Sequence, residues 1–228
     1  SKMADGVAQV RTLMEQLREA SFAPAERDLV ELNAMAAAAG AATPLRQWDI
    51  AFWAERLREE RFAIEEEAMR PWLPFPRVLE GLFELAGELF GVRFVDATKD
   101  VSTWHDDVRF YRVLRVDGQD EVEVAGFFLD PYSRPAEKRG GAWMDECVGR
   151  SLLLGSNGDA RLPVAYLVCN GTPPVDGAPS LMRFREVETL FHEFGHGLQH
   201  MMTTVDDGLA SGIRNVEWDA VELPSQFM

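Results

Sequence analysis

The chain has 228 residues, enough for one large domain or two small ones, and 46% of them are hydrophobic, which can supply a core. Its 38 acidic and 23 basic residues give a formal charge of −15, which argues against nucleic acid and anionic membranes as partners. The sequence contains no run of 18 apolar residues, so no membrane span is expected.

The first 91 residues are predicted to form a helical array. Apolar residues recur at helical spacing in four segments, which are 5–20, 24–39, 49–62 and 76–90. Ser21 and Pro24 predict a break between the first two helices, because proline is favoured in the first turn of a new helix. Gly40 and Gly91 are expected to end the second and fourth helices, since glycine readily adopts the left-handed conformation that follows a helix.

Beyond Gly91 the composition changes to that of strands. Residues 92–95 and 108–116 are rich in β-branched and aromatic side chains, which favour strands. The turn signal Asp117–Gly118 separates the second of these from a similar run over 122–129. We therefore predict a β-hairpin within this part of the chain.

The next part is predicted to contain a surface loop and a further strand. Residues 133–160 are rich in glycine and charge, which favours a loop at the surface. Residues 163–170 form a compact apolar run of strand length. Such a strand could lie at a sheet edge, where it would offer main-chain hydrogen bonds to an extended peptide, or inside the sheet. The sequence leaves both alternatives open.

Residues 183–201 are predicted to form one helix that carries a metal-binding motif. His192 and His196 lie four residues apart and so about 40° apart around the helix, which lets both imidazoles reach one metal ion. Glu193 lies about 100° from His192 and borders the same face. Two neutral histidine ligands with a neighbouring carboxylate are typical of zinc hydrolases. The motif therefore predicts one Zn²⁺ ion, with Glu193 as the catalytic general base.

A catalytic zinc ion usually takes three protein ligands, and the third is expected beyond the motif helix. The acidic candidates in that part of the chain are Asp206, Asp207, Glu217, Asp219 and Glu222. Asn215 is expected to cap a second helix that carries the last three, and Pro224 is expected to kink or end that helix. Spacing alone does not choose between Glu217 and Glu222.

The remaining histidines and one cysteine are expected to be structural. His200 lies about 80° from His192 around the helix, which disfavours it as a third helical ligand. His105 is predicted to be a hydrogen-bonded loop residue. Cys169 is predicted to be a small buried side chain and not a nucleophile.

Several segments resemble the thimet oligopeptidase and oligopeptidase A family of zinc metallopeptidases, most closely its oligopeptidase A branch. The resemblance covers roughly residues 45–228 and rests on six segments, which are 104–110, 140–145, 162–170, 191–197, 211–212 and 218–226. The ligand glutamate of that family precedes a Leu/Val-Pro-Ser-Gln segment, which maps to Glu222 and not to Glu217. The resemblance therefore implies zinc held by His192, His196 and Glu222, with Glu193 as the base.

The resemblance also implies a fold. It is a helical metallopeptidase catalytic fold, in which a ligand helix follows the motif helix and a deep channel admits short peptides. Combined with the elements above, it predicts a mainly α fold with a small β-sheet or hairpin: a helical array over 1–91, and a small sheet with zinc-binding helices over 92–228. Family members are considerably longer, and their C-terminal substrate-binding residues match nothing here. The chain is therefore expected to be an internal piece, an incomplete catalytic domain.

The motif and the resemblance support two functional hypotheses. The first is a zinc-dependent endopeptidase that hydrolyses short peptides, at least in the parent protein. The alternative is a catalytically inactive fragment that binds zinc or peptide. Under both, we expect short peptides as partners, no nucleic acid, no membrane, and a monomer.

The small number of cysteines bears on the cellular compartment in which the protein is expected. Cys147 and Cys169 are the only two, too few for a disulfide framework in a chain of this length. The first four residues lack the apolar core of a signal peptide. We therefore expect the cytoplasm or an organelle lumen, mitochondrial or chloroplast, and not secretion.

Overall fold

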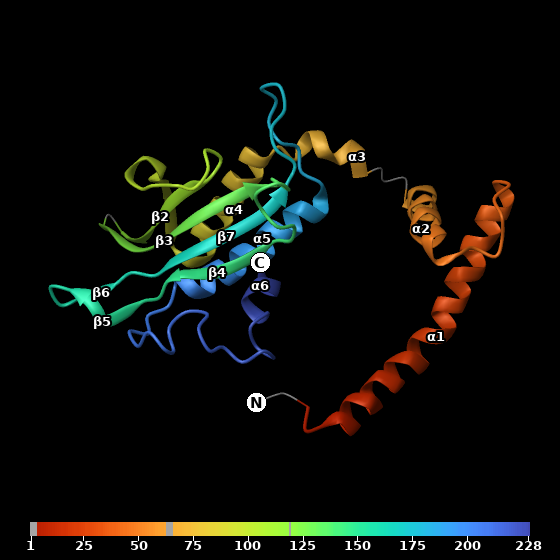
Figure 1. Cartoon of the computed structure of the whole chain (residues 1–228), viewed down its shortest axis with the longest axis horizontal. Coiled ribbons are helices and arrows are strands. Elements are labelled where there is room, and N and C mark those ends of the chain that lie inside the picture. Colours follow the sequence, from red (N-terminus) through yellow and green to blue (C-terminus); the bar gives the residue numbers. More distant parts are fainter. Residues whose placement is uncertain (1–3, 63–65, 119) are drawn as a thin grey trace. The chain divides into compact units, whose positions relative to one another are not determined.

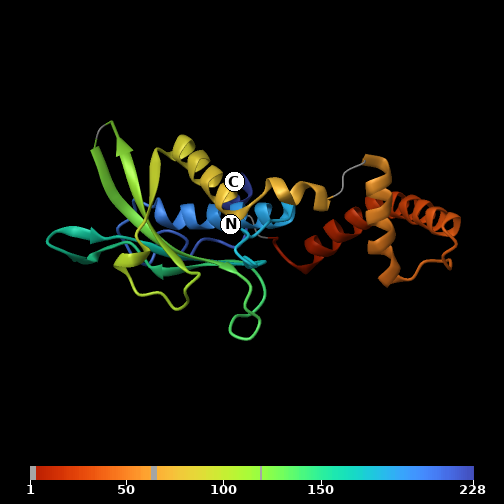
Figure 2. The same ribbon diagram turned by 90° about the horizontal axis from the view of Figure 1, so that it is seen from above.

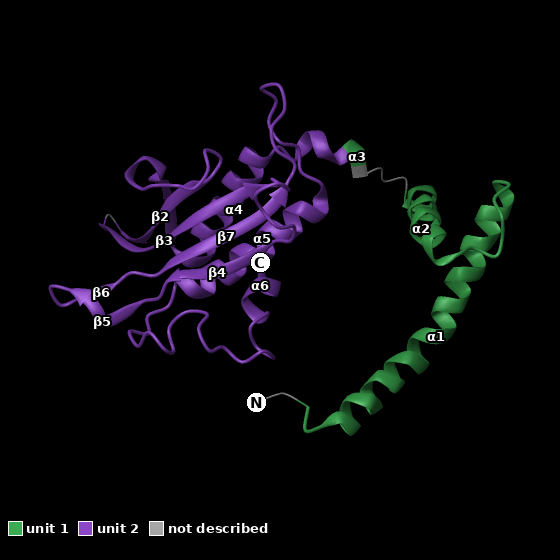
Figure 3. Cartoon of the chain, in the orientation of Figure 1, with its two compact units in different colours: residues 1–68 green, residues 69–228 purple. Residues whose placement is uncertain are grey.

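The computed structural model describes residues 4–62, 66–118 and 120–228 (Figure 1). The chain divides into two compact units, residues 1–68 and residues 69–228 (Figure 3). Each unit is described by itself. None of the helices within the described ranges is long and apolar enough to cross a membrane.

The first unit consists of helices. Its long helices are α1 (Val7–Ala38) and α2 (Gln47–Phe62), and the short α3 (Glu66–Met69) lies at the boundary. The predicted break at Ser21 and Pro24 is wrong, because α1 continues through Pro24. A proline inside a helix removes one backbone hydrogen bond, and a helix of 32 residues keeps the rest. Polar contacts also join α1 to later residues of this unit: Arg61 of α2 pairs with Glu31, and the Leu45 N–H donates to Asn33 Oδ1 at 2.9 Å.

Both glycines that were expected to end helices do so. Gly40 follows the end of α1 with φ of +77°. Gly91 is the C-cap of α4 (Phe75–Phe90) in the left-handed conformation, and its N–H donates to the Gly87 carbonyl. These two turns confirm where α1 and α4 end.

The second unit contains a five-stranded sheet in the order β1-β2-β3-β7-β4. Its strands are β1 (Val92–Asp96), β2 (Arg109–Asp117), β3 (Asp120–Tyr132), β4 (Trp143–Val148) and β7 (Val164–Gly171). A separate two-stranded sheet pairs β5 (Ser151–Ser156) with β6 (Asp159–Arg161). The pair β3 and β7 is parallel, whereas the other pairs are antiparallel. Its helices are η1 (Arg70–Trp72), α4, η2 (Thr98–Asp100), α5 (Phe184–Met201) and α6 (Leu223–Phe227).

The predicted hairpin is confirmed, since β2 and β3 are antiparallel neighbours around the Asp117–Gly118 turn. The surface loop predicted over 133–160 is wrong from Trp143 onward, where β4, β5 and most of β6 lie. The pairing of β4 with β7 is long-range, so the local glycine-rich composition did not reveal it. The run 163–170 is the internal strand β7, between β3 and β4, and the edge strand on this side of the sheet is β4.

One face of the sheet carries the hydrophobic core. Successive strand residues point to opposite faces, so Phe127 and Leu129 of β3 and Leu167 of β7 share this face. Helices α4 and α5 cover it and contribute Leu82 and Phe194 (Figure 2). Because α4 packs on this sheet, it belongs to the second compact unit. The units therefore differ from the predicted grouping of residues 1–91 as one helical array.

Candidate metal centre

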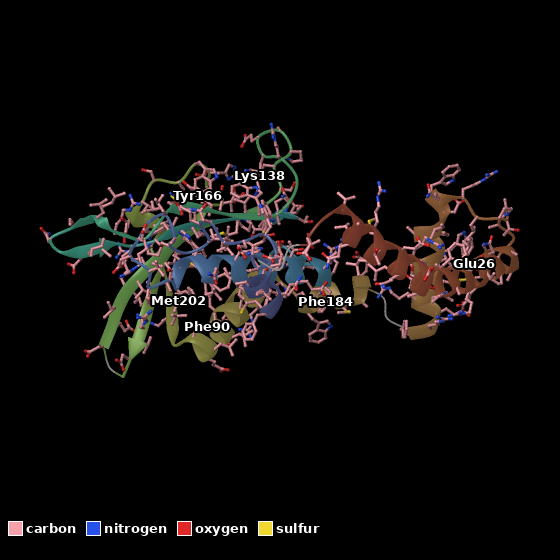
Figure 4. The ribbon with its side chains drawn as sticks, turned by 90° about the horizontal axis from the view of Figure 1, so that it is seen from below. Glu26, Phe90, Lys138, Tyr166, Phe184 and Met202 are labelled. Atoms are coloured by element: carbon pink, nitrogen blue, oxygen red, sulfur yellow. The ribbon has the colours of Figure 1, made fainter. Side chains whose placement is uncertain are left out.

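Helix α5 carries the two histidines and the glutamate of the motif. It begins after Arg183, whose N–H donates to the Glu186 side chain at 2.7 Å, so that the first turn is capped. Four apolar residues of α5 are buried in the core, which are Leu190, Phe194, Leu198 and Met201. Their burial fixes how the helix is rotated about its own axis. Figure 4 labels Phe184, where the helix begins, and Met202, which follows its last residue. The side chains of the motif are thereby held in one orientation.

The structure brings His192 and His196 together with Glu222. The two imidazole rings lie with their centroids 5.0 Å apart and their planes at 90°. Glu222 Oε2 lies 3.3 Å from His192 Nε2 and 3.2 Å from His196 Nε2. Among the described residues, these three form the single group of three or more His, Cys, Asp or Glu residues that could hold a metal ion.

Glu222 reaches this position from the N-terminus of α6. The expected helix capped by Asn215 is wrong, because residues 218–222 form turns and α6 begins only at Leu223. Asn215 has a φ of +57°, which is not the geometry of an N-cap, and its Nδ2 donates to the Leu209 carbonyl. Pro224 was expected to end a helix, yet it lies in the first turn of one, where proline is favoured.

Other acidic candidates in this part of the chain have different partners. Asp206 Oδ1 accepts a hydrogen bond from Arg150 Nε at 2.7 Å. Asp207 Oδ1 accepts one from the Leu209 N–H at 2.9 Å. Neither these two residues nor Glu217 and Asp219 belong to the group around the histidines.

The geometry of the three side chains fits a zinc ion. Zinc binds nitrogen and oxygen ligands at about 2.0–2.2 Å in a tetrahedron, which places two ligand atoms about 3.3–3.6 Å apart. The two measured separations between Glu222 Oε2 and the ring nitrogens, 3.3 and 3.2 Å, lie close to this range. Two imidazoles and one carboxylate are also a donor set that zinc accepts.

The electrostatics of His196 suit a metal ligand. Burial lowers the pKa of His196 below its ordinary value, and the neighbouring His192 acts in the same direction. The Glu222 carboxylate and the Val221 backbone oppose this shift without cancelling it. A lowered pKa keeps the imidazole neutral, which is the form that binds a metal.

Glu193 is buried beside the two histidines, with 9% of its surface exposed. Burial raises the pKa of the Glu193 carboxyl, and the nearby Glu222 carboxylate raises it further. The His192 ring and the Met144 backbone N–H act in the opposite direction. A raised pKa makes the carboxyl a stronger base than an ordinary carboxylate, which suits a group that accepts a proton from water.

The sequence did not indicate the contact between Glu193 and Met144. Met144 lies on the edge strand β4, within the stretch that composition predicted to be a loop. Residues 143–148 read as two apolar, two acidic and two apolar residues, which is not the alternation of period two that predicts a half-buried strand. The local sequence therefore carries no strand signal here.

The residues expected to be structural are confirmed in that role. His200 is fully buried, and its Nε2 lies 3.0 Å from the Val148 carbonyl oxygen. His105 Nδ1 accepts a hydrogen bond from the Asp107 N–H at 3.1 Å. Burial raises the pKa of the Cys169 thiol to about 12, with Glu193 adding to the shift, so this thiol stays protonated.

Comparison with known proteins identifies the family to which this chain is related. The model of peptidase family M3 matches residues 1–228. The chain is 54% identical to the organellar oligopeptidase A, chloroplastic/mitochondrial, of Arabidopsis thaliana, and 43% identical to oligopeptidase A of Escherichia coli. Both alignments cover the whole of this chain but only 29% and 32% of those relatives.

A third relative is the probable cytosolic oligopeptidase A of Arabidopsis thaliana, 54% identical over the whole chain and 32% of that protein. The chain thus spans about a third of the length of the curated relatives it matches. The match of the family model over every residue, together with these identities, decides the assignment. The chain belongs to peptidase family M3.

Proposed function

We propose that the protein is a zinc-dependent endopeptidase that hydrolyses short peptides, and that His192, His196, Glu193 and Glu222 form its catalytic centre. The observation that carries the proposal is the convergence of one carboxylate oxygen on both ring nitrogens, beside a buried glutamate. The family and the relatives named oligopeptidase A support peptides as the substrate class.

Each residue has a distinct role in this proposal. His192, His196 and Glu222 would hold one Zn²⁺ ion through Nε2 atoms and a carboxylate oxygen. Zinc, when bound, lowers the pKa of water and polarises a peptide carbonyl. Glu193 accepts the proton of the attacking water and then donates it to the amine of the leaving peptide. The raised pKa of Glu193 makes it a stronger base than an ordinary carboxylate and so favours the first of these transfers.

We further propose that the chain is part of a longer protein whose remaining residues complete the peptide-binding cleft. Support comes from the relatives, of which it covers 29% to 32%. The relatives named organellar and cytosolic support an organelle or the cytosol as the compartment. The alternative is that these residues bind zinc or peptide without turnover.

The test of Glu193 replaces it with glutamine in the full-length parent protein. Glu193→Gln keeps the size of the side chain but cannot accept a proton, so cleavage of a quenched short peptide should fall by at least about 100-fold while the zinc content stays the same. Glu188→Gln is the matched control, because Glu188 is exposed on the same helix. Equal cleavage by Glu193→Gln and the unchanged enzyme would rule out Glu193 as the base.

A second measurement separates the two functional hypotheses. The 228-residue chain is loaded with zinc, its metal content is measured, and the same peptide is added. Stoichiometric zinc without cleavage supports a site that needs the rest of the parent protein. Brisk cleavage would contradict the proposal that further residues are required.

A further inference from the structure

Gly195 lies in the middle of α5, between the two histidines, and is buried. Glycine is less favourable than alanine inside a helix, so its presence there needs a structural reason. The reason is a close approach of α6. A Cβ atom added at Gly195 would lie 2.5 Å from the Pro224 carbonyl oxygen and 2.7 Å from Ser225 Cα.

The atoms that meet this Cβ belong to the backbone and cannot turn aside as a side chain does. The third nearest atom, the Pro224 carbonyl carbon at 3.0 Å, is a backbone atom as well. Any side chain at position 195 would therefore move α6 away from α5. Glu222 directly precedes α6 as its N-cap residue, so the same movement would carry its carboxylate away from the two histidines.

Ser225 holds the Glu222 carboxylate from the other direction. Its side chain is buried, with 2% of the residue exposed. The Ser225 hydroxyl lies 2.9 Å from Glu222 Oε2 and also 2.9 Å from the Glu222 carbonyl oxygen. The Ser225 hydroxyl can therefore donate to Glu222 Oε2. This is the same oxygen that lies 3.3 Å from His192 Nε2 and 3.2 Å from His196 Nε2.

We propose that Gly195 and Ser225 are positioning residues for Glu222: Gly195 lets the α6 backbone approach α5, and the Ser225 hydroxyl orients the carboxylate towards His192 and His196. This inference rests on the proposed function, because it assigns to both residues an effect on zinc binding. Groups that orient a metal ligand commonly change metal affinity by about 10- to 100-fold when they are removed.

The same helix provides a matched control. Gly197 is also buried in α5, but a Cβ there would meet the ends of two side chains, Leu167 Cδ2 at 3.1 Å and Met201 Cε at 3.5 Å. Side-chain ends can adjust by a few tenths of an ångström. Gly197→Ala thus makes the same chemical change, two residues away, without meeting the α6 backbone.

The experiment measures the zinc affinity of the 228-residue chain by competition with a chelator. The absorption spectrum of the Co²⁺-substituted chain reports the coordination geometry. Gly195→Ala should weaken zinc binding by at least about tenfold and alter the Co²⁺ spectrum, whereas Gly197→Ala should stay within about threefold of the unchanged chain. Ser225→Ala, which leaves the backbone in place, should weaken binding by about tenfold.

Zinc affinity of Gly195→Ala equal to that of Gly197→Ala, with an unchanged Co²⁺ spectrum, would overturn the role of Gly195. Should Gly195→Ala fail to fold by circular dichroism, Ser225→Ala decides: weaker binding supports the proposal, and unchanged binding overturns it. If the unchanged chain binds no zinc, the proposed function itself fails. If the unchanged chain binds zinc and both variants bind it equally well, only this inference fails.

Discussion

Two buried carboxylates of the second unit show how environment determines the state of a side chain. Glu193 has a raised pKa, because burial dominates over its few favourable contacts. For Asp130, 2% exposed, burial alone would raise the pKa. Hydrogen bonds from Arg134, Lys138 and Trp104 outweigh that effect and hold the pKa below its ordinary value. Glu193 is therefore suited to proton transfer, whereas Asp130 is suited to holding structure.

Asp130 anchors the segment that leads into the edge strand β4. Arg134 donates to both of its carboxylate oxygens, at 2.8 and 2.6 Å, and Lys138 Nζ lies 3.0 Å from Oδ1. The Arg134 and Lys138 side chains are only 14% and 9% exposed. Lys138 lies in a loop, as its local composition predicted, but composition did not reveal that its side chain is largely buried against Asp130, because that pairing depends on the folded chain. Lys138 and Tyr166, labelled in Figure 4, line one pocket together with Asp130.

The replacement Asp130→Asn should lower the free energy of unfolding by about 3 kcal/mol, because it leaves two buried cations without their countercharge. Urea unfolding at about pH 7 measures this loss. Glu137→Gln is the control, since Glu137 is 69% exposed and lies 3.9 Å from Arg134 Nε. It should change stability by less than about 0.5 kcal/mol.

The pH dependence of stability tests the role of Asp130 in a second way. The pKa of Asp130 is lower in the folded chain than the value of about 3.9 in an unfolded chain. The contribution of the Asp130 charge to the free energy of unfolding is thus fully present above about pH 4. It is lost as the pH falls through the folded-state pKa of Asp130. The difference in stability between the unchanged chain and Asp130→Asn should shrink in this range. A difference that stays constant down to about pH 2 would show that the Asp130 charge is not responsible.

At the scale of elements, local patterns predicted the structure wherever local interactions determine it. Helices α4 and α5 and strands β1, β2 and β7 lie within one or two residues of their predicted bounds. The misses at β4 and α6 depend on distant partners, whereas the break expected at Pro24 was wrong because α1 continues through that proline. The edge strand β4 is defined by its pairing with β7, and α6 is a single short helix placed against α5. The sequence alone also left the third ligand open, since Glu222 reaches the histidines through this packing.

The central contact of α5 with the sheet is Phe194. It is 1% exposed, and its ring lies 5.5 to 6.0 Å from those of Phe94, Phe127 and Phe83, measured between centroids. Phe194→Ala should therefore lower the free energy of unfolding by about 3–5 kcal/mol, because it removes a large ring and leaves a cavity. Thermal or urea unfolding measures the loss.

The control for Phe194→Ala is Phe184→Ala at the first position of the same helix. Phe184 is 49% exposed, so its truncation should cost about 1 kcal/mol or less. Equal losses for the two variants would contradict the assignment of Phe194 to the core that fixes α5.

For the whole molecule, the two units differ in how they bury apolar surface. The second unit has a continuous core between the sheet and helices α4 and α5. In α1 of the first unit only Leu32 and Ala36 are buried, and many large apolar side chains are exposed. A longer parent protein, as proposed, would supply surfaces for them. The sequence predicted the helices of the first unit but not their exposure, because periodicity shows which side chains share a face and not what covers that face.

The proposed zinc ion, held by His192, His196 and Glu222, can be located by experiment. The measurement is an anomalous-difference map recorded at the zinc absorption edge from crystals of the chain grown with zinc. We expect a single peak at about 2.0–2.2 Å from both Nε2 atoms and from a Glu222 carboxylate oxygen. A peak bonded to Glu217 or another side chain in place of Glu222, or ordered histidines with no peak between them, would contradict this expectation.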